Sequence, residues 1–194
     1  CLARAKEMIG WDEKYPVRDM GNGKVRSVGA AMAMQGSGIS GVDTGAVAIK
    51  VNDDGFYSLM IGASDMGTGC DTILAQMAAD CLDCEMDQII VSGVDTDSSP
   101  YDCGSYASST TYVTGMAVVK TCETLKKKIM ERGAQYLDVP ADEVEFDGKK
   151  VIHLSSGKEI SLKEIGNHVM CSSNEPLMAS EANSSPISPP PFMA

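Results

Sequence analysis

The spacing of hydrophobic and polar positions first predicts a β-hairpin. Val47, Ile49 and Val51 alternate with smaller or polar residues, and a second β-rich run covers residues 56–62. Residues 52–55 lie between the two runs and end in Asp-Gly, which is typical of a tight turn between antiparallel strands. We therefore expect two paired strands here, each with one face toward the core.

Farther along the chain, the spacing of the apolar residues changes from two to four. Beginning at Thr72, the apolar residues Ile73, Met77 and Cys81 recur four residues apart, as they would on one face of a helix, and Leu74 and Ala78 fill the same stripe. We expect Asp71 or Thr72 to cap the first turn, because a short oxygen-bearing side chain there can accept a backbone N–H.

A longer helix is predicted over residues 112–132, after a strand at residues 89–94 and a polar loop at residues 95–111. Its expected core face holds Val118, Cys122, Leu125 and Ile129, and its expected solvent face holds Lys120, Glu123 and Lys127. Upstream of the first hairpin, Ala, Met and Gly dominate residues 29–41, where we expect a strand that enters a glycine-rich loop.

The C-terminal part predicts a second hairpin and a short helix. Asp-Gly at residues 147–148 separates the runs 144–146 and 151–153. Ser161 and Glu164 have the spacing of a capping box, so a helix should begin there and end near Met170.

These elements predict an α+β fold, in which β-hairpins and a mixed sheet pack against two main helices. We expect an N-terminal helix at Leu2–Ile9 with a link in residues 1–28, one partial domain in residues 29–182, and a Ser/Pro-rich tail in residues 183–194. The chain opens without Met and closes after a proline run, so we expect a piece of a longer polypeptide.

Charge and cysteine content narrow the class of partner. The 194 residues carry a net charge of -11, so no basic surplus exists to displace the counterions of a nucleic acid. No run of the sequence is long and apolar enough to predict a transmembrane helix. Seven cysteines without a regular spacing or a secretory signal favour reduced thiols. We therefore expect a cytoplasmic protein that binds neither nucleic acid nor membrane.

The segment Asp65–Thr72 joins a predicted strand to a predicted helix through a glycine turn. Gly67 and Gly69 flank Thr68, and glycine permits positive φ and the close approach of a ligand. The helix that follows offers unpaired N–H groups and a partial positive charge, which suit an anion or a polar heterocycle. The segment lacks the Gly-Lys-Ser/Thr of a P-loop and the third glycine of a dinucleotide fingerprint, so an ordinary tight turn is the competing interpretation.

The second polar loop ends in a dense group of hydroxyls directly before the longer helix. Five of the seven positions from Ser105 to Thr111 are Ser or Thr, although one hydroxyl would suffice to cap a helix. Hydroxyls and unpaired amides at a helix N-terminus suit a phosphate or pyrophosphate. If the strands before the two loops run parallel in one sheet, both helices begin at the same edge, where ligands of α/β layers gather.

Taken together, the two loops resemble a known family. The relevant stretches are DGFYSLMIGASDMGTGCDTILAQMAADCL at residues 54–82 and DTDSSPYDCGSYASSTTYVTGMAV at residues 95–118. They resemble the molybdenum-binding subunit of the xanthine dehydrogenase/aldehyde oxidase family. In that family an acidic residue precedes a Gly-Gln-Gly turn, and a Gly-Thr-x-Ser-Arg-Thr-Thr-like segment precedes a helix. The resemblance extends over Gly29–Ile129.

The resemblance implies a cofactor-binding fragment of a molybdenum hydroxylase, which oxidises a purine, another N-heterocycle or an aldehyde with water as the oxygen donor. The implied cofactor is a molybdenum–pyranopterin (molybdopterin), in its simple form or in a cytosine dinucleotide form. The implied partners are the rest of the molybdenum subunit and the Fe–S and flavin (FAD) subunits or domains.

The resemblance also implies which residues contact the cofactor. These are Gly67, Thr68, Gly69, Ser108, Ser109, Thr110 and Thr111. The glycine turn would lie against the pterin and dithiolene side. Ser108, Thr110 and Thr111 would hold the cofactor's phosphate, or the pyrophosphate of a dinucleotide form. Thr68 replaces the family's usual Gln, and Ser109 stands where many members have Arg, so one side-chain contact and one charge contact are not expected to carry over unchanged.

The family's catalytic base is a Glu in a Gly-x-Gly-Glu-like motif, and that motif does not occur in this sequence. Hydroxylation beside a ring nitrogen needs that base at the metal, so we predict no catalytic residue and no metal ligand in this chain. The competing hypothesis is a non-catalytic phosphate-ligand-binding or assembly domain that keeps the same fold.

Two further groups of residues have simpler interpretations. Cys81 and Cys84 form a C-x-x-C without a second pair, which favours packed thiols over half of a zinc site. Cys70, beside the glycine turn, is the one thiol for which ligand contact is worth testing. The run Lys126–Lys128 is typical of a solvated helix face.

Overall fold

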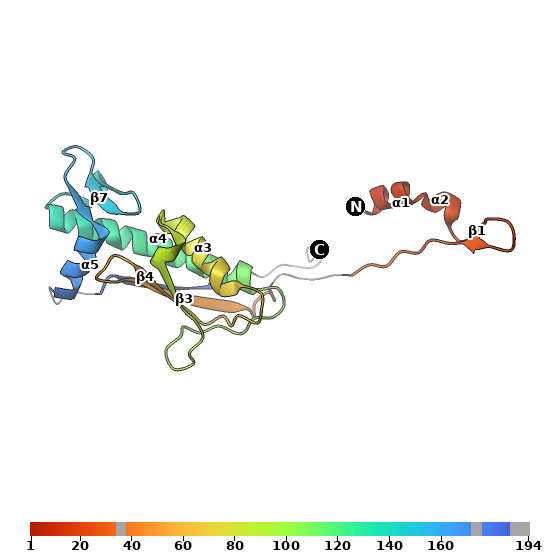
Figure 1. Cartoon of the computed structure of the whole chain (residues 1–194), viewed down its shortest axis with the longest axis horizontal. Coiled ribbons are helices and arrows are strands. Elements are labelled where there is room, and N and C mark those ends of the chain that lie inside the picture. Colours follow the sequence, from red (N-terminus) through yellow and green to blue (C-terminus); the bar gives the residue numbers. More distant parts are fainter. Residues whose placement is uncertain (34–37, 172–175, 187–194) are drawn as a thin grey trace. The chain divides into compact units, whose positions relative to one another are not determined.

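The computed structural model describes residues 1–33, 38–171 and 176–186. The chain divides into two compact units, Cys1–Met34 and Gln35–Ala194, which Figure 1 shows. The smaller unit contains α1 (Leu2–Ile9), α2 (Trp11–Lys14), β1 (Arg18–Asp19) and β2 (Val25–Arg26). The predicted N-terminal helix is thus confirmed. None of the described side chains in residues 1–33 is buried.

A four-stranded mixed sheet forms the base of the larger unit, in the order β5-β4-β3-β9. Its strands are β3 (Thr44–Val51), β4 (Tyr57–Ile61), β5 (Ile89–Ser92) and β9 (Met178–Ser184). β3 pairs antiparallel with β4 and with β9, whereas β4 and β5 run parallel. The predicted first hairpin and the mixed sheet are both confirmed.

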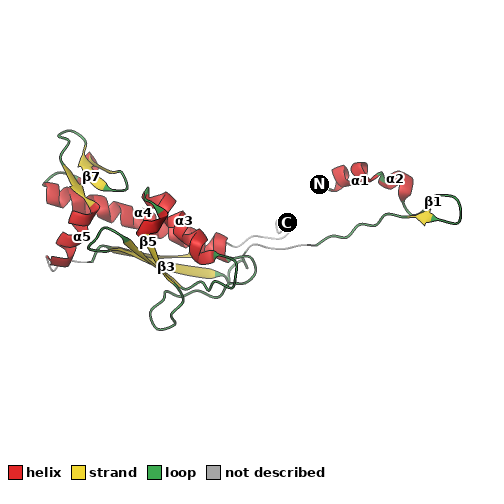
Figure 2. Cartoon of the chain, in the orientation of Figure 1, coloured by secondary structure: helices red, strands yellow, loops and turns green. Residues whose placement is uncertain are grey.

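Two helices, α3 (Cys70–Leu82) and α4 (Thr110–Leu137), pack on one face of this sheet (Figure 2). The four predicted core-facing residues of α4 are all fully buried: Val118, Cys122, Leu125 and Ile129. They meet Val47 and Ile49 of β3, which are also fully buried. On α3, Leu74 and Ala78 of the predicted stripe are fully buried, together with Leu82. The other predicted residues of the stripe, Ile73, Met77 and Cys81, are only partly buried.

The order of these elements places both helix starts at one edge. β4 leads into α3 and β5 leads into α4. Because β4 and β5 are parallel, the condition stated from the sequence is met, and both loops leave the sheet at the same edge. This arrangement brings together the two loops that the sequence singled out.

A smaller layer covers the C-terminal half of α4. It consists of β6 (Val144–Phe146), β7 (Lys150–His153), β8 (Glu159–Ser161) and α5 (Leu162–Cys171), and the short 3-10 helix η2 (Ala141–Glu143) leads into β6. A second 3-10 helix, η1 (Met86–Gln88), lies between α3 and β5. The second hairpin is confirmed by the antiparallel pairing of β6 and β7. The capping box is confirmed too, because Ser161 N–H donates to Glu164 Oε2 at 2.9 Å and Glu164 N–H donates to Ser161 Oγ at 3.2 Å.

Several predicted boundaries were wrong. α3 begins at Cys70, two residues early, with Gly69 rather than Asp71 or Thr72 at its N-cap, because Gly69 adopts the left-handed conformation that turns the chain into the helix. α4 is longer than predicted at both ends. The described residues 29–33 and 38–41 contain no strand, and residues 34–37 lie outside the described part.

The predicted tail and the lysine run also differ in detail. β9 extends to Ser184, so its last two residues pair with β3 at the start of the predicted tail; residues 187–194 lie outside the described part. Lys126 is not simply solvated, because its Nζ donates to Cys81 O at 3.1 Å and pairs with Asp83.

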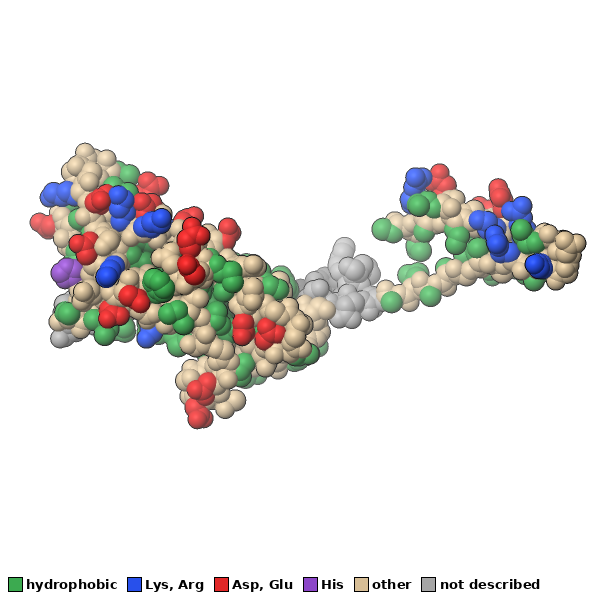
Figure 3. All heavy atoms as spheres, viewed as in Figure 1, with side chains coloured by type: hydrophobic (Ala, Val, Ile, Leu, Met, Phe, Trp, Pro, Cys, Tyr) green, Lys and Arg blue, Asp and Glu red, His purple; other side chains and the backbone are tan. Residues whose placement is uncertain are grey.

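The surface of the larger unit agrees with the acidic composition. Figure 3 shows Asp and Glu side chains spread over its visible face. Among the described residues, no helix combines the length and the apolar composition needed to cross a bilayer.

Candidate cofactor-binding site

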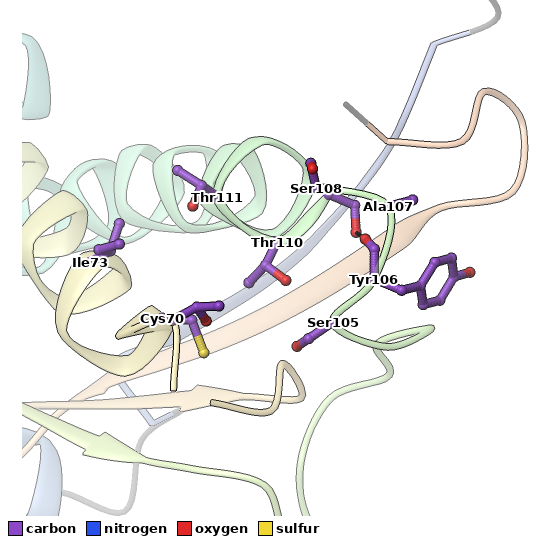
Figure 4. A pocket seen from close by; sticks show the side chains of 10 residues that line it. Cys70, Ile73, Ser105, Tyr106, Ala107, Ser108, Thr110 and Thr111 are labelled. Carbon is purple, nitrogen blue, oxygen red and sulfur yellow. Dashed lines mark hydrogen bonds between the residues drawn. The ribbon is translucent and has the colours of Figure 1, made fainter. Parts of the chain in front are cut away.

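A cavity of about 460 Å³ lies where the two loops meet the starts of α3 and α4 (Figure 4). Its lining residues are Thr68, Cys70, Ile73, Ser105, Tyr106, Ala107, Ser108, Ser109, Thr110 and Thr111. Thr68 and the four predicted cofactor-binding residues 108–111 therefore line one cavity. Gly67 and Gly69 flank Thr68 in the sequence. None of these described lining residues carries a charged side chain.

The glycine turn already holds an anion, and that anion belongs to the chain. Gly67 and Gly69 have φ of 97° and 76°. Their N–H groups both donate to Asp65 Oδ1, at 2.8 Å and 3.1 Å. These bonds, first that from Gly67, hold the pKa of Asp65 below its usual range. The expected anion seat is therefore occupied by Asp65, and Thr68 is the residue of the turn that reaches the cavity.

The start of α3 is electronegative. Asp71 lies in its first turn, and the carboxylates of Asp65 and Asp71 and the thiol of Cys70 lie within 4.8 Å of one another. Burial raises the pKa of Cys70 to about 11, and the two carboxylates add to this shift. The thiol thus keeps its proton at neutral pH. We assign no metal to this group, since Asp65 serves the glycine amides.

The start of α4 has the opposite character. Within the described chain, its first turn contains no acidic residue and its N-cap, Ser109, makes no side-chain cap hydrogen bond. The first helical bond runs from Val113 N–H to Ser109 O at 2.6 Å. The earlier amides of a helix have no intrahelical partner and carry a partial positive charge. Here they lie beside the hydroxyl-bearing Thr110 and Thr111.

Two hydroxyls of the dense group serve the loops themselves. Ser109 is only 3% exposed, and its Oγ donates to Tyr106 O at 2.7 Å. Ser105 Oγ donates to Ser64 O at 2.7 Å and accepts the Ser64 N–H at 3.1 Å. The hydroxyls of this group therefore have two roles, because some support the loops and others line the cavity.

A buried carboxylate supports the second loop from behind. Asp43 is fully buried and its Oδ2 accepts the Ile39 N–H at 2.6 Å. The Cys103 thiol lies 3.9 Å from Asp43 Oδ1, and hydrogen bonds to Cys103 and Asp43 raise the pKa of Tyr106. This role was not predictable, because Asp43 is a single acid in an apolar, glycine-rich stretch. Asp65, by contrast, stands two positions before Gly67, a spacing that favours a local side-chain-to-backbone turn.

Comparison with known proteins agrees with this geometry. The family model described as a molybdopterin cofactor-binding domain matches residues 4–190. The chain belongs to this family. The resemblance read from the two loops is thus confirmed, and so is the α+β fold class.

Individual members give the extent of the similarity. The chain is 35% identical over 167 residues to a probable hypoxanthine oxidase of Escherichia coli, covering 86% of the chain and 17% of that protein. It is 29% identical to the xanthine dehydrogenase molybdenum-binding subunit of E. coli O157:H7, over 71% of the chain and 19% of that subunit. The solved CO dehydrogenase of Oligotropha carboxidovorans aligns with a TM-score of 0.68 and 25% identity, over 79% of the chain and 20% of that structure. The chain thus spans about a fifth or less of the length of these relatives.

Proposed function

We propose that this chain forms one wall of the molybdopterin site in a molybdenum hydroxylase that oxidises a purine, another N-heterocycle or an aldehyde. The observation that carries the proposal is the convergence of Thr68 and residues 108–111 on one cavity. Family membership supports the cofactor, and the names of the two E. coli relatives support a heterocyclic substrate.

The donor set of the cavity suits a phosphate-bearing cofactor. Hydroxyls of Thr110 and Thr111 and the first amides of α4 are hydrogen-bond donors, and helix starts of this kind bind phosphate. The start of α3 would repel an anion, because Asp65 and Asp71 lie there. The proposal therefore directs the phosphate end of the cofactor to α4 and its uncharged ring end to Thr68.

Within this proposal the chain binds and orients the cofactor, and it moves no proton. When bound, the molybdenum cofactor supplies the redox chemistry that introduces oxygen from water into the substrate. Gly67 and Gly69 would shape the turn that presents Thr68. Ser109 would stabilise the second loop through its bond to Tyr106 rather than through a contact with the phosphate. The catalytic base would come from a part of the enzyme beyond these residues.

We further propose that this enzyme works in the cytoplasm with Fe–S and flavin (FAD) subunits and with the rest of the molybdenum subunit. All seven cysteines are free thiols, which supports a reducing compartment. The word subunit in the name of one E. coli relative supports partner chains in general.

The test is the double substitution Ser108→Ala with Thr111→Val in the intact enzyme. We expect molybdenum and pterin content to fall about tenfold or more, because a hydrogen bond to a charged group contributes about 1.5–3 kcal/mol. Metal analysis and pterin fluorescence measure the content, with Ser98→Ala as a control in the same loop. Unchanged content in the double variant would contradict the proposal. If the intact protein binds phosphate but never contains pterin, the competing hypothesis of a non-catalytic domain would be favoured.

A further inference from the structure

The two walls of the cavity are joined by the side chain of one serine. The first wall is the glycine turn with the start of α3, and Ser64 lies directly before this turn. The second wall is the segment 105–111, which begins with Ser105. The Ser105 hydroxyl donates to the Ser64 carbonyl at 2.7 Å and accepts the Ser64 N–H at 3.1 Å. A hydroxyl can do both at once, so it satisfies the two backbone groups of one residue as a paired strand would.

On the side of the second wall, this serine is anchored to α4. Gly104 has φ of 124° and its N–H donates to Asp102 Oδ1 at 2.9 Å. The other carboxylate oxygen of Asp102 accepts the Thr114 hydroxyl at 2.8 Å. Because Thr114 is buried in the second turn of α4, Asp102 fixes the chain beside Ser105 to the helix.

On the side of the first wall, the same series of contacts reaches α3. Ser64 precedes Asp65, which holds the amides of Gly67 and Gly69. Gly69 is the N-cap of α3. A nearly continuous set of hydrogen bonds therefore runs from α4 to the start of α3, and Ser105 is the point at which it crosses between the walls.

We propose that Ser105 is a positioning residue that fixes the separation of the two cavity walls and so slows release of the bound cofactor. This proposal rests on the proposed function of the cavity. The glycine turn is exposed, and Ser64 and Ser105 lie 41 residues apart in sequence, so contacts between the walls, and not the connecting chain, set their spacing. The bonds of Ser105 to Ser64 add to the packing of α3 against α4 in keeping Thr68 and Thr110 in their relative positions.

The experiment compares Ser105→Ala, Ser105→Thr and Ser98→Ala in the intact enzyme loaded with its cofactor. The measurement is the rate at which molybdenum and pterin leave the protein during dilution into a chelator. For Ser105→Ala we expect release about fivefold faster, the effect of losing an ordinary hydrogen bond. Ser105→Thr keeps the hydroxyl and should release the cofactor within about twofold of the natural rate. Among the described residues, the Ser98 hydroxyl bonds only to Asp95 Oδ2, within its own turn, and its removal should leave the rate unchanged.

Two results would overturn this role. The first is that Ser105→Ala releases the cofactor at the same rate as the natural protein. The second is that Ser105→Thr releases it as fast as Ser105→Ala, because the hydroxyl would then not be the cause. Faster exchange of the Ser64 amide in Ser105→Ala supports the role even if the melting temperature also falls. If Ser108→Ala with Thr111→Val loses the cofactor while Ser105→Ala retains it normally, the positioning role fails and the proposed function stands. If the double variant retains the cofactor, the proposed function itself fails.

Discussion

Ala107 and Ser108 adopt left-handed backbone conformations, with φ of 50° and 54°, although neither is glycine. Such a conformation costs an L-residue roughly 1–2 kcal/mol. Both residues line the cavity, and the Ala107 carbonyl accepts the Gly38 N–H at 3.0 Å. Backbone strain that surrounding contacts maintain is characteristic of ligand sites. The strained pair therefore turns the chain into α4 at the place where the cofactor phosphate is proposed to bind.

Ala107→Gly tests this strain. Glycine removes the steric cost but increases the entropy of the unfolded chain, so we expect the free energy of unfolding to rise by about 0.5–1 kcal/mol. Denaturant unfolding measures this difference. Ala117→Gly, in the regular part of α4, should have the opposite sign because glycine weakens a helix. A loss of stability in Ala107→Gly would show that the left-handed conformation carries no penalty here.

Asp65 makes the stability of the folded protein depend on pH. Its pKa is lowered in the folded protein by the Gly67 and Gly69 amides. A depressed folded pKa means that the contribution is present above the unfolded pKa, about 4, and is lost as pH falls through the lower folded value. Asp65→Asn keeps an acceptor oxygen and does not titrate. The stability advantage of the natural protein over Asp65→Asn should therefore shrink below pH about 4 in acid unfolding. A difference that stays constant down to pH about 2 would contradict this assignment.

Among the elements, β3 and α4 make a close contact beside the second loop. A Cβ on Gly45 would lie 2.4 Å from Thr114 Oγ1 and 3.0 Å from the Thr114 Cα. Gly45 thus lets α4 approach β3 closely enough for Thr114 to reach Asp102. The second loop depends on this approach, because Asp102 also holds Gly104.

Gly45→Ala should separate these elements. We expect a loss of about 1–3 kcal/mol in the free energy of unfolding, the usual effect of an extra methyl in a packed core. Thermal or denaturant unfolding measures it, and Gly93→Ala is the control because its Cβ would meet only Asp71 Oδ2 at 3.7 Å. Equal stability of the two variants would mean that the contact at Gly45 is not tight.

Some elements were predictable from the sequence and others were not. The hairpin and the core face of α4 were predictable because each follows from periodicity or turn chemistry within a short segment, whereas the parallel pairing of β4 and β5 entered only as a condition. β9 was not predictable, because the sequence MASEANS has no β pattern and forms a strand only by pairing with β3. For the same reason, the sequence indicated the hydroxyls of the site but not the contact of Ser105 with Ser64, which joins residues distant in the chain.

For the molecule as a whole, the cavity is an uncharged region of a strongly acidic protein. The net charge is -11, yet the ten described lining residues carry no charged side chain. Local donors must therefore hold an anion against an unfavourable overall field. The first turn of α4 supplies such donors without an acidic residue of its own.

The pairing of β3 with β9 has a consequence for biosynthesis. Lys50 and Met178 are neighbours in the sheet but are separated by most of the chain. While the ribosome is still making the intervening segments, β3 has one edge without its final partner, and an open strand edge can pair with another polypeptide. Closing so large a loop is slow. The nascent chain therefore exposes one edge of its central strand until β9 has been made, which makes this edge a place where a chaperone would act.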